Sequence, residues 1–585
     1  MGMGKDRKVP TKTFNIARHT LQILHLPIRP YTELAFSEAR RLRSKRVFTE
    51  VSGGGLGLEK LGIVVSVNGS RAQCSIDLSV LSAIRAQSQG DATAHSISSF
   101  IKIRSQDQLI FGSLVSLDTS LPPGGKATAE VELIGQGTAN EDGRAANFTR
   151  GVNAYPHPGD EVAFCEEQDF AVMFSPEGED HVHIGTVYPS AGVRAPILTN
   201  RFLGRHFAIV GSSGAGKSTL TAMLLNRITA DQPNAHVIVL DPHGEYSRSF
   251  GSAAKIWNVD NLRLPYWMMN LEEHCDALLP FDSIDRATDS NILAKCLLAA
   301  RARTIGLGDS RKLTADSPVP YRLADLTEAL EEESGKLEKL ADASRYTRIR
   351  LNILQYFADP RFSFIFNAEY ADESIEQTIS DILRLPTDGQ PFSVLDLTGV
   401  PTEIINVVVA SIARMVLDFA IWAPREEKPP FLFVCEEAHR YLPRTVTPAT
   451  RSVVRQVERI AREGRKYGVC LGLVTQRPSE LSETALSQCG TMISLRLNNK
   501  QDQEFLKASI PESARSYIEV IPALRNRECI VSGEGVPVTL RVRIDNLEEA
   551  LRPSSADPEF TSGWSRQQDA PALVEKGVRR WRGMN

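Results

Sequence analysis

The sequence predicts an α/β protein with a mostly parallel, helix-covered sheet built around a phosphate-binding loop. A largely helical insertion interrupts this sheet, and a small antiparallel β-barrel or sandwich precedes it. Three observations lead to this fold class. A glycine-rich loop at 211–218 lies between an apolar strand segment and a helix-like segment. More apolar strand segments follow residue 200, with helical segments between several of them. Between about 50 and 190, short runs of alternating apolar and polar residues are broken by glycine.

The barrel is predicted for residues 50–190. Two alternating runs flank Asn68-Gly69, a dipeptide typical of a tight hairpin turn. Before them, residues 1–49 form a polar, arginine-rich leader that could contact nucleic acid or a partner, or could be a solvated helix face. Further barrel strands are expected at 109–117, 127–133, 161–164 and 181–187.

The α/β domain is predicted to span 191–545, with the helical insertion at about 270–385 and a charged C-terminal segment at 546–585. Helices are expected in the insertion at 323–340 and 345–357. The strand segments expected after residue 200 are 207–210, 237–240, 392–397, 431–435, 469–474 and 492–497, followed by a short β tail at 529–532 and 538–544.

Composition indicates a soluble, cytoplasmic protein. The chain has 585 residues, of which 42% are hydrophobic and 24% charged, and its net charge is −4. This charge does not itself point to nucleic acid, although a ring can line its pore with basic residues while its outside is acidic. The eight cysteines include no CxxC pair, which favours free thiols in a reducing compartment over a zinc ribbon.

The most membrane-like stretch, 404–423, contains Arg414 and Asp418, which are costly at a bilayer centre. We therefore expect a packed helix of a soluble domain and no membrane partner. The N-terminus has no apolar region of the signal-peptide kind.

The loop Gly211-Ser-Ser-Gly214-Ala-Gly216-Lys217-Ser218 has the composition of a phosphate-binding loop. Its glycines let successive main-chain N–H groups surround phosphates, Lys217 supplies a positive charge, and Ser218 offers its hydroxyl to Mg²⁺. The helix that follows directs its N-terminal dipole at the anion. A bare glycine-rich turn would not require the lysine, the hydroxyl and both flanking elements together.

An apolar strand at 431–435 ends in the adjacent carboxylates Glu436 and Glu437, a Walker B pattern. The first carboxylate can bind the coordination shell of Mg²⁺, for example through a metal-bound water. The second can orient and deprotonate a water molecule. Glu436 stands where aspartate is commoner, but it can still reach a metal-bound water. Alone, the pair could be an acidic helix cap; a phosphate loop on the same sheet favours the catalytic interpretation.

The strand at 469–474 ends in Thr475-Gln476, and an amide at such a strand end can sense the γ-phosphate. Between the Walker B strand and this strand, a helix carries a basic stripe, and Arg465 adds a further charge. A basic helix that ends next to a nucleotide site suits an arginine finger, so Arg462 or Arg465 could reach the ATP of a neighbouring subunit. Such stripes are also common as solvated faces. The stripe consists of Arg455, Arg459, Arg462 and Lys466.

Polar residues also follow the strand at 237–240, in the run Asp241-Pro-His243-Gly-Glu245-Tyr246. Ligands of open α/β sheets bind at the carboxyl ends of strands, which makes Asp241 a candidate ligand. The Asp-Pro and Gly could equally mark a plain turn.

Together these motifs resemble those of the HerA family of hexameric ATPases, relatives of the FtsK translocases. The resemblance covers about 50–545. It implies a RecA-like P-loop ATPase core with a helical insertion, an N-terminal β-barrel, and a homo-hexameric ring with ATP and Mg²⁺ between subunits. The motifs that carry it are Arg205-His206 before the phosphate loop, Asp241-Pro-His-Gly-Glu-Tyr246, Glu436-Glu437-Ala-His439, Arg462-Glu-Gly-Arg465-Lys466 and Thr475-Gln476-Arg477-Pro478.

By position, the resemblance implies that Glu437 is the catalytic base, Gln476 the sensor, and Arg462 or Arg465 the finger acting on a neighbour. Arg205 could add a second phosphate contact or be a surface charge. The predicted catalytic residues are Glu437, Gln476, Arg462 and Arg465; the predicted nucleotide-binding residues are Gly211, Gly214, Gly216, Lys217, Ser218, Thr219, Asp241 and Arg205; the predicted metal-binding residues are Ser218 and Glu436.

The resemblance also implies movement of double-stranded DNA through the ring, with an effector partner such as a NurA-like nuclease or, in phage defence, a sirtuin-like NADase or another effector. The main rival is a nucleotide-dependent ring scaffold that assembles and regulates an effector enzyme, because the sequence has no recognisable nuclease or NADase site of its own. A secretion or conjugation ATPase would favour a membrane anchor, and the sequence contains no apparent one.

Overall fold

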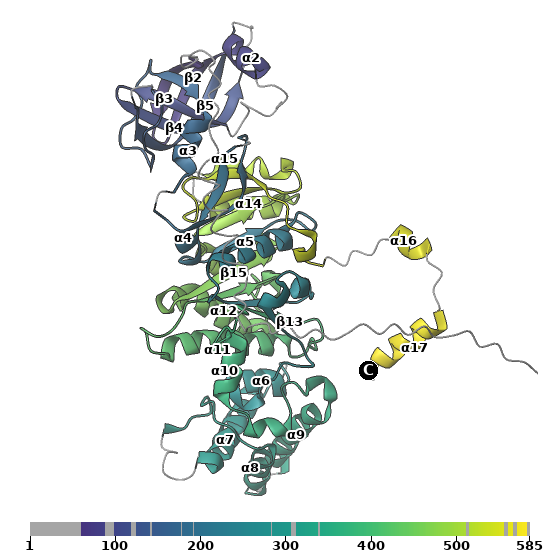
Figure 1. Ribbon diagram of the computed structural model, residues 1–585. Coiled ribbons are helices and arrows are strands. Elements are labelled where there is room, and N and C mark those ends of the chain that lie inside the picture. Colours follow the sequence, from purple (N-terminus) through teal and green to yellow (C-terminus); the bar gives the residue numbers. More distant parts are fainter. Residues whose placement is uncertain are drawn as a thin grey trace, which may run out of the picture. The chain divides into compact units, whose positions relative to one another are not determined.

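The structure is a computed structural model that describes twelve stretches of the chain, and Figure 1 labels their elements. The predicted leader at 1–49 lies outside them. The described residues are 60–87, 99–118, 125–140, 143–176, 178–190, 192–281, 283–305, 312–336, 340–510, 514–554, 560–565 and 570–581.

Short alternating strands close into an antiparallel barrel in the order β2-β1-β7-β3-β4-β5, because β2 also pairs with β5. Alternate side chains such as Ala129 and Val131 are fully buried inside it. The predicted hairpin is confirmed, since Asn68 pairs with Arg71 and Gly69 has a φ of +58°. The barrel strands are β1 (Gly62–Asn68), β2 (Arg71–Asp77), β3 (Phe100–Ser105), β4 (Gln108–Asp118), β5 (Lys126–Thr138) and β7 (Glu161–Phe164); β6 (Thr149–Arg150) pairs with β5, and α2 (Leu78–Gln87) and α3 (Glu167–Phe174) follow β2 and β7.

The strand predicted at 181–187 forms, but its assignment to the barrel is wrong. It is β8 (His181–Val187), which pairs with β9 (Arg194–Leu198) and with a strand near residue 540 in a second sheet. Its alternating pattern is the same as that of a barrel strand, because both kinds of strand bury one set of side chains. Only the long-range pairing reveals which sheet it joins.

The second sheet has the order β12-β13-β11-β14-β15-β10-β16-β17-β18-β8-β9, and its neighbours are parallel from β12 to β16. The predicted α/β class is thereby confirmed. β12 was not predicted because four residues with a central lysine give no clear periodicity. The strands are β10 (Phe207–Val210), β11 (His236–Asp241), β12 (Ala254–Trp257), β13 (Phe392–Asp396), β14 (Phe431–Cys435), β15 (Val469–Thr475), β16 (Thr491–Ser494), β17 (Glu528–Gly533) and β18 (Leu540–Ile544).

Alternate side chains of the central strands enter two different apolar cores. Phe207 and Ile209 of β10 pack in the core that contains α5 (Lys217–Asp231). Ala208 and Val210 pack in the core that contains α11 (Ile405–Trp422) and α12 (Arg451–Glu463). Burial on both faces explains why these strands are continuous apolar runs in the sequence.

The insertion between β12 and β13 is helical, as predicted. α7, α8 and α9 contact one another (Figure 1), and the wholly buried Arg301 donates from Nη2 to the main-chain oxygens of Trp267 and Met269 at 3.2 and 3.0 Å. These bonds satisfy carbonyls that would otherwise be buried without a donor. The helices are α6 (Leu271–Leu278), α7 (Arg286–Ile305), α8 (Leu323–Gly335), α9 (Leu340–Ala358) and α10 (Ile375–Leu383).

Among the described helices, α11 alone is long and apolar enough to cross a membrane, with a mean hydropathy of 1.7. Nevertheless, 61% of its 18 residues are buried within the structure. Arg414 donates from Nε to Glu273 Oε1 at 2.7 Å, and Asp418 accepts from Arg459 at 3.1 Å. Burial between the sheet and the insertion accounts for its apolar character, in agreement with the packed helix expected from the sequence.

The insertion contains a histidine that is held in its neutral form. His274 is fully buried, with Nδ1 2.8 Å from the main-chain oxygen of Asn270 and Nε2 2.9 Å from the Tyr321 hydroxyl. This arrangement suits a ring that donates from Nδ1 and accepts at Nε2. Burial lowers the pKa of His274 to about 3. Between pH 6.5 and 3, the unfolded chain therefore binds a proton that the folded chain does not, and stability falls as the pH falls.

We expect His274→Gln to reduce this acid sensitivity. At pH 5, the titration of one unfolded histidine accounts for a loss of about 2 kcal/mol in unfolding free energy. Thermal unfolding at pH 7 and pH 5 should therefore show a smaller loss on acidification in the variant than in the wild type. Equal losses in both proteins would contradict the neutral, buried state of His274.

Candidate nucleotide site

The glycine-rich loop connects β10 to the first turn of α5. Gly214 and Gly216 have φ values of +72° and +101°, which glycine adopts without strain. A Cβ atom on Gly211 would lie 2.8 Å from Cβ of Leu495, so only glycine fits there. Lys217 is buried, and its Nζ donates to the main-chain oxygen of Ser212 at 3.4 Å.

Ser218 and Thr219 follow Lys217 in the first turn of α5, and both are half-buried. The first main-chain N–H groups of a helix have no acceptor within the helix. These groups, the lysine and the hydroxyls together form a cradle suited to the phosphates of a nucleotide.

Four adjacent strands bring their carboxyl ends to one edge of the sheet, called here the carboxyl edge. β11, β14, β15 and β10 are neighbours in this order and run parallel. Asp241, Glu436 and Gln476 therefore lie at the edge where the phosphate loop leaves β10. Ligands of open α/β sheets bind at this edge. Gln476 is half-buried there, directly after Thr475 of β15.

Glu436 is almost completely buried after the last residue of β14. Its Oε2 accepts a hydrogen bond of 2.7 Å from the hydroxyl of Tyr246. Burial raises the pKa of Glu436, and the neighbouring Glu437 carboxylate raises it further, whereas Tyr246 and the charge of Lys217 oppose the shift. Positive charge from a metal ion would act in the same direction as Lys217 and favour the carboxylate form.

Glu437 has an unusual main-chain conformation for a non-glycine residue, with a φ of +48° and a ψ of 47°. Such strain costs about 1–3 kcal/mol and clusters at functional sites. Its Oε2 is buried, accepts no hydrogen bond among the described residues, and lies 3.3 Å from Nδ1 of His439. The same nitrogen is 3.1 Å from the hydroxyl of Thr475. His439 thus links the Walker B carboxylate to the strand that carries Gln476.

The carboxylate of Asp241 holds the turn that follows β11, and its contact with a nucleotide stays a prediction. Asp241 is fully buried, and its carboxylate accepts main-chain N–H groups of His243, Glu245 and Tyr246 at 3.3, 3.1 and 2.8 Å. Both oxygens are therefore used to hold the turn, and the turn interpretation accounts for the residue. Tyr246, which sequence reasoning did not single out, is the residue of this motif that contacts Glu436.

Mg²⁺ fits the donors at this edge. It prefers hydroxyl, carboxylate and phosphate oxygens and keeps several waters, so one or two protein ligands are enough. Glu436 supplies a carboxylate, Ser218 a hydroxyl, and the carboxylate of Glu437 follows directly in the chain. The described residues contain no cluster of three or more His, Cys, Asp or Glu side chains that could hold a metal alone.

The predicted arginines lie at the opposite, amino edge of the sheet. α12 carries the chain back from the end of β14 to the start of β15, as a crossover between parallel strands must. α12 therefore ends away from the nucleotide site of its own chain. The expectation that it ends next to a nucleotide site is wrong for that site. His206 fixes the end of α12, because its ring lies 3.0 Å from the Ala461 oxygen and accepts from the N–H of Leu471 at 2.9 Å.

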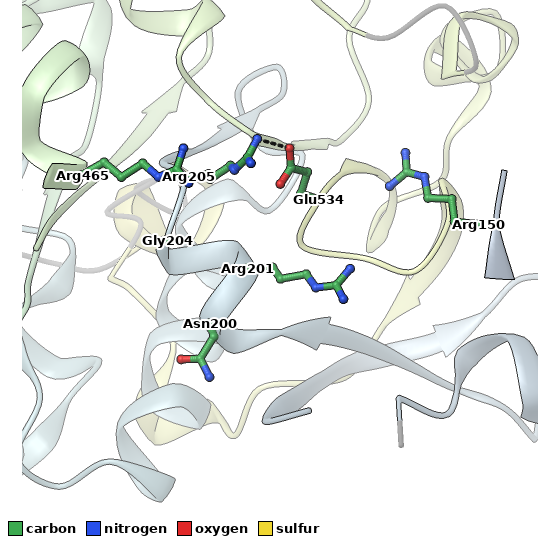
Figure 2. A pocket seen from close by; sticks show the side chains of 7 residues that line it. All are labelled: Arg150, Asn200, Arg201, Gly204, Arg205, Arg465 and Glu534. Atoms are coloured by element: carbon green, nitrogen blue, oxygen red, sulfur yellow. Dashed lines mark hydrogen bonds and ion pairs between the residues drawn. The ribbon is translucent and has the colours of Figure 1, made fainter. Parts of the chain in front are cut away.

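Arg205 and Arg465 line the same hollow, which Figure 2 shows together with Arg150 and Arg201. Arg205 forms an ion pair with Glu534 (Figure 2). It precedes β10 and therefore lies at the amino edge, away from the phosphate loop of its own chain. A larger adjoining hollow of about 1050 Å³ is lined by Arg150, Arg205, Arg462, Arg465 and Lys466. Glu534 also lines this hollow, but positive side chains outnumber it, which suits an anion supplied by another molecule.

The basic stripe of α12 is largely neutralised within the chain. Arg455 pairs with Glu272, Arg459 with Asp418, and Arg462 with Glu458. Glu458 is itself held by the Ser482 hydroxyl at 2.6 Å. Arg465 and Lys466 are exposed, and neither has an ion pair within the described stretches. Of the two predicted finger candidates, the structure therefore favours Arg465.

Comparison with known proteins gives a consistent result. Residues 182–416 match the family model described as "Helicase HerA, central domain", and residues 379–536 match "Helicase HerA-like C-terminal". The chain is 26% identical to the DNA double-strand break repair helicase HerA of Pyrococcus furiosus over 442 residues, covering 68% of this chain and 75% of that protein. It is 26% identical to the protein of the same name from Saccharolobus solfataricus, covering 72% and 79%.

Among solved structures, VirB4 of Thermoanaerobacter pseudethanolicus matches with a TM-score of 0.46 and 15% identity, covering 64% of this chain and 99% of that one.

Proposed function

The chain belongs to the HerA family of the FtsK–HerA superfamily and is an ATP-hydrolysing enzyme, and from this premise we propose that it is an ATP-driven motor that moves double-stranded DNA. Its relatives from Pyrococcus and Saccharolobus are named as DNA double-strand break repair helicases. The observation that carries the proposal is the convergence of the phosphate loop, both Walker B carboxylates and Gln476 at one edge of the sheet.

In the proposed reaction, Lys217 leaves the Ser212 carbonyl and binds the β- and γ-phosphates of ATP. Ser218 and Glu436 would hold Mg²⁺, which would supply positive charge to offset the charge of the phosphates. Glu437 accepts a proton from the attacking water, whose oxygen bonds to the γ-phosphorus as the bond to the ADP oxygen breaks, and Gln476 orients that water.

We further propose that the subunits form a homo-hexameric ring in which each nucleotide lies between two subunits. The phosphate loop and Arg465 lie at opposite edges of the sheet, and this supports catalysis by two different subunits. Arg465 would contact the γ-phosphate of a neighbour's ATP, and Arg205 would add charge at the same place.

Duplex DNA distinguishes this motor from the rival, a ring scaffold that regulates an effector enzyme. We expect linear duplex DNA to raise the ATPase rate of the full chain several-fold, because a motor couples hydrolysis to its track. ATP turnover should be measured against duplex length, with Lys217→Ala as the inactive control. An unchanged rate at every length would favour the scaffold.

An effector partner, such as a NurA-like nuclease or a sirtuin-like NADase, and a role in DNA end processing or phage defence belong to the same proposal, as does a cytoplasmic location. Support for them comes from the family resemblance. Purification from the native host, followed by mass measurement of the intact complex, would identify the partner and the number of subunits.

A further inference from the structure

Tyr246 is a fully buried residue that the proposed reaction does not use. Its hydroxyl donates to Oε2 of Glu436 at 2.7 Å, although the two residues are 190 positions apart in the chain. A buried carboxylate is costly unless its oxygens are hydrogen-bonded. This contact therefore affects the same carboxylate that the proposed reaction assigns to the metal.

A series of further contacts holds Tyr246 in place. Its main-chain N–H donates to Asp241 Oδ2 at 2.8 Å. Its ring stacks on Phe250, with centroids 5.9 Å apart and planes 4° apart. Phe250 in turn stacks on Phe392 of β13, with centroids 3.9 Å apart. The hydroxyl thus reaches Glu436 from a rigid support that extends across neighbouring strands.

We propose that Tyr246 is a positioning residue that orients Glu436 toward the divalent cation bound with the nucleoside triphosphate. This inference rests on the proposed function of the same site. With Oε2 engaged by the tyrosine hydroxyl, Oε1 is left for the cation or its water shell. Asp241 acts one step further away, because it fixes the turn that carries Tyr246. Partners that orient metal ligands commonly contribute 10–100-fold to metal affinity.

Tyr246→Phe tests the proposal, since it removes the hydroxyl and keeps the stacked ring. The measurement is the Mg²⁺ concentration that gives half-maximal binding of a non-hydrolysable ATP analogue to the full chain. We expect this concentration to rise by about 10-fold, while binding of the analogue without Mg²⁺ stays the same. An unchanged Mg²⁺ requirement would overturn the proposal.

Tyr441→Phe is the matched control. Tyr441 is also buried, at 1% exposure, and its hydroxyl has no hydrogen-bond partner in the described part of the chain. We expect the Mg²⁺ requirement of this variant to equal that of the wild type. A rise as large as that of Tyr246→Phe would overturn the proposal, because it would mean that loss of any buried hydroxyl near the site has this effect.

A double-mutant cycle with Glu436→Gln separates positioning from a general structural role. If Tyr246 acts through Glu436, Tyr246→Phe should not raise the Mg²⁺ requirement further in the Glu436→Gln background. An additive rise would contradict the proposal. Asp241→Asn offers a second route if Tyr246→Phe does not fold, and it should raise the Mg²⁺ requirement in the same direction.

The Mg²⁺ requirement for binding of the ATP analogue is measured without DNA. If duplex DNA left the ATPase rate of the wild-type protein unchanged, the proposed motor would be refuted, whereas the Mg²⁺ result would still stand.

Discussion

Replacing Glu437 by glutamine is expected to lower the rate of ATP hydrolysis by about 10²–10⁴-fold while ATP still binds. The amide has nearly the same shape but cannot accept the proton of the attacking water. Oε2 of Glu437 is buried and has no hydrogen-bond partner among the described residues, and the substitution replaces one of the two carboxylate oxygens by an NH₂ group. Single-turnover hydrolysis and equilibrium binding of ATP would separate the two effects.

Glu480→Gln is the control for loss of negative charge at the same edge of the sheet. Glu480 follows β15 and pairs with Arg477 on the surface, with about half of its side chain exposed. An exposed pair of this kind contributes little, so hydrolysis should stay close to wild type. Unimpaired turnover in Glu437→Gln would contradict its assignment as the base.

Arg465→Ala is expected to lower the hydrolysis rate by about 10³-fold or more, because an arginine finger stabilises the charge that develops on the transferred phosphoryl group. We expect a smaller loss from Arg462→Ala, since the guanidinium of Arg462 is already paired with Glu458. Lys466→Ala is the matched control, because this cation adjoins Arg465 and is likewise exposed. Steady-state ATP turnover of the three variants gives the comparison.

Mixed oligomers test whether Arg465 acts on a neighbouring subunit. Subunits with Lys217→Ala keep Arg465 but cannot hold phosphates, and subunits with Arg465→Ala keep the phosphate loop. At some interfaces of a mixture, an intact loop faces an intact arginine, so partial activity should return although each variant alone is inactive. No recovery at any ratio, with mixing verified by mass measurement, would contradict catalysis between subunits.

Local patterns in the sequence were enough to predict most elements. The glycines and lysine of 211–218 predicted the loop because its main-chain geometry depends on residue types that are adjacent in the chain. Continuous apolar runs such as Phe431–Cys435 predicted central strands, and the alternating runs around Asn68-Gly69 predicted a barrel hairpin. The catalytic roles of Glu437, Gln476 and Arg465 remain predictions.

By itself, the sequence determined the phosphate loop, the Walker B pair, the strand and helix segments and the family resemblance, because each is carried by residues close together in the chain. Only the tertiary structure decided that β8 joins the large sheet, that Tyr246 holds Glu436, and that α12 ends at the edge opposite its own phosphate loop. It also decided which arginines are already paired. These facts depend on contacts between distant segments. The periodicity of a single segment indicates which of its side chains are buried, but not which distant segment packs against them.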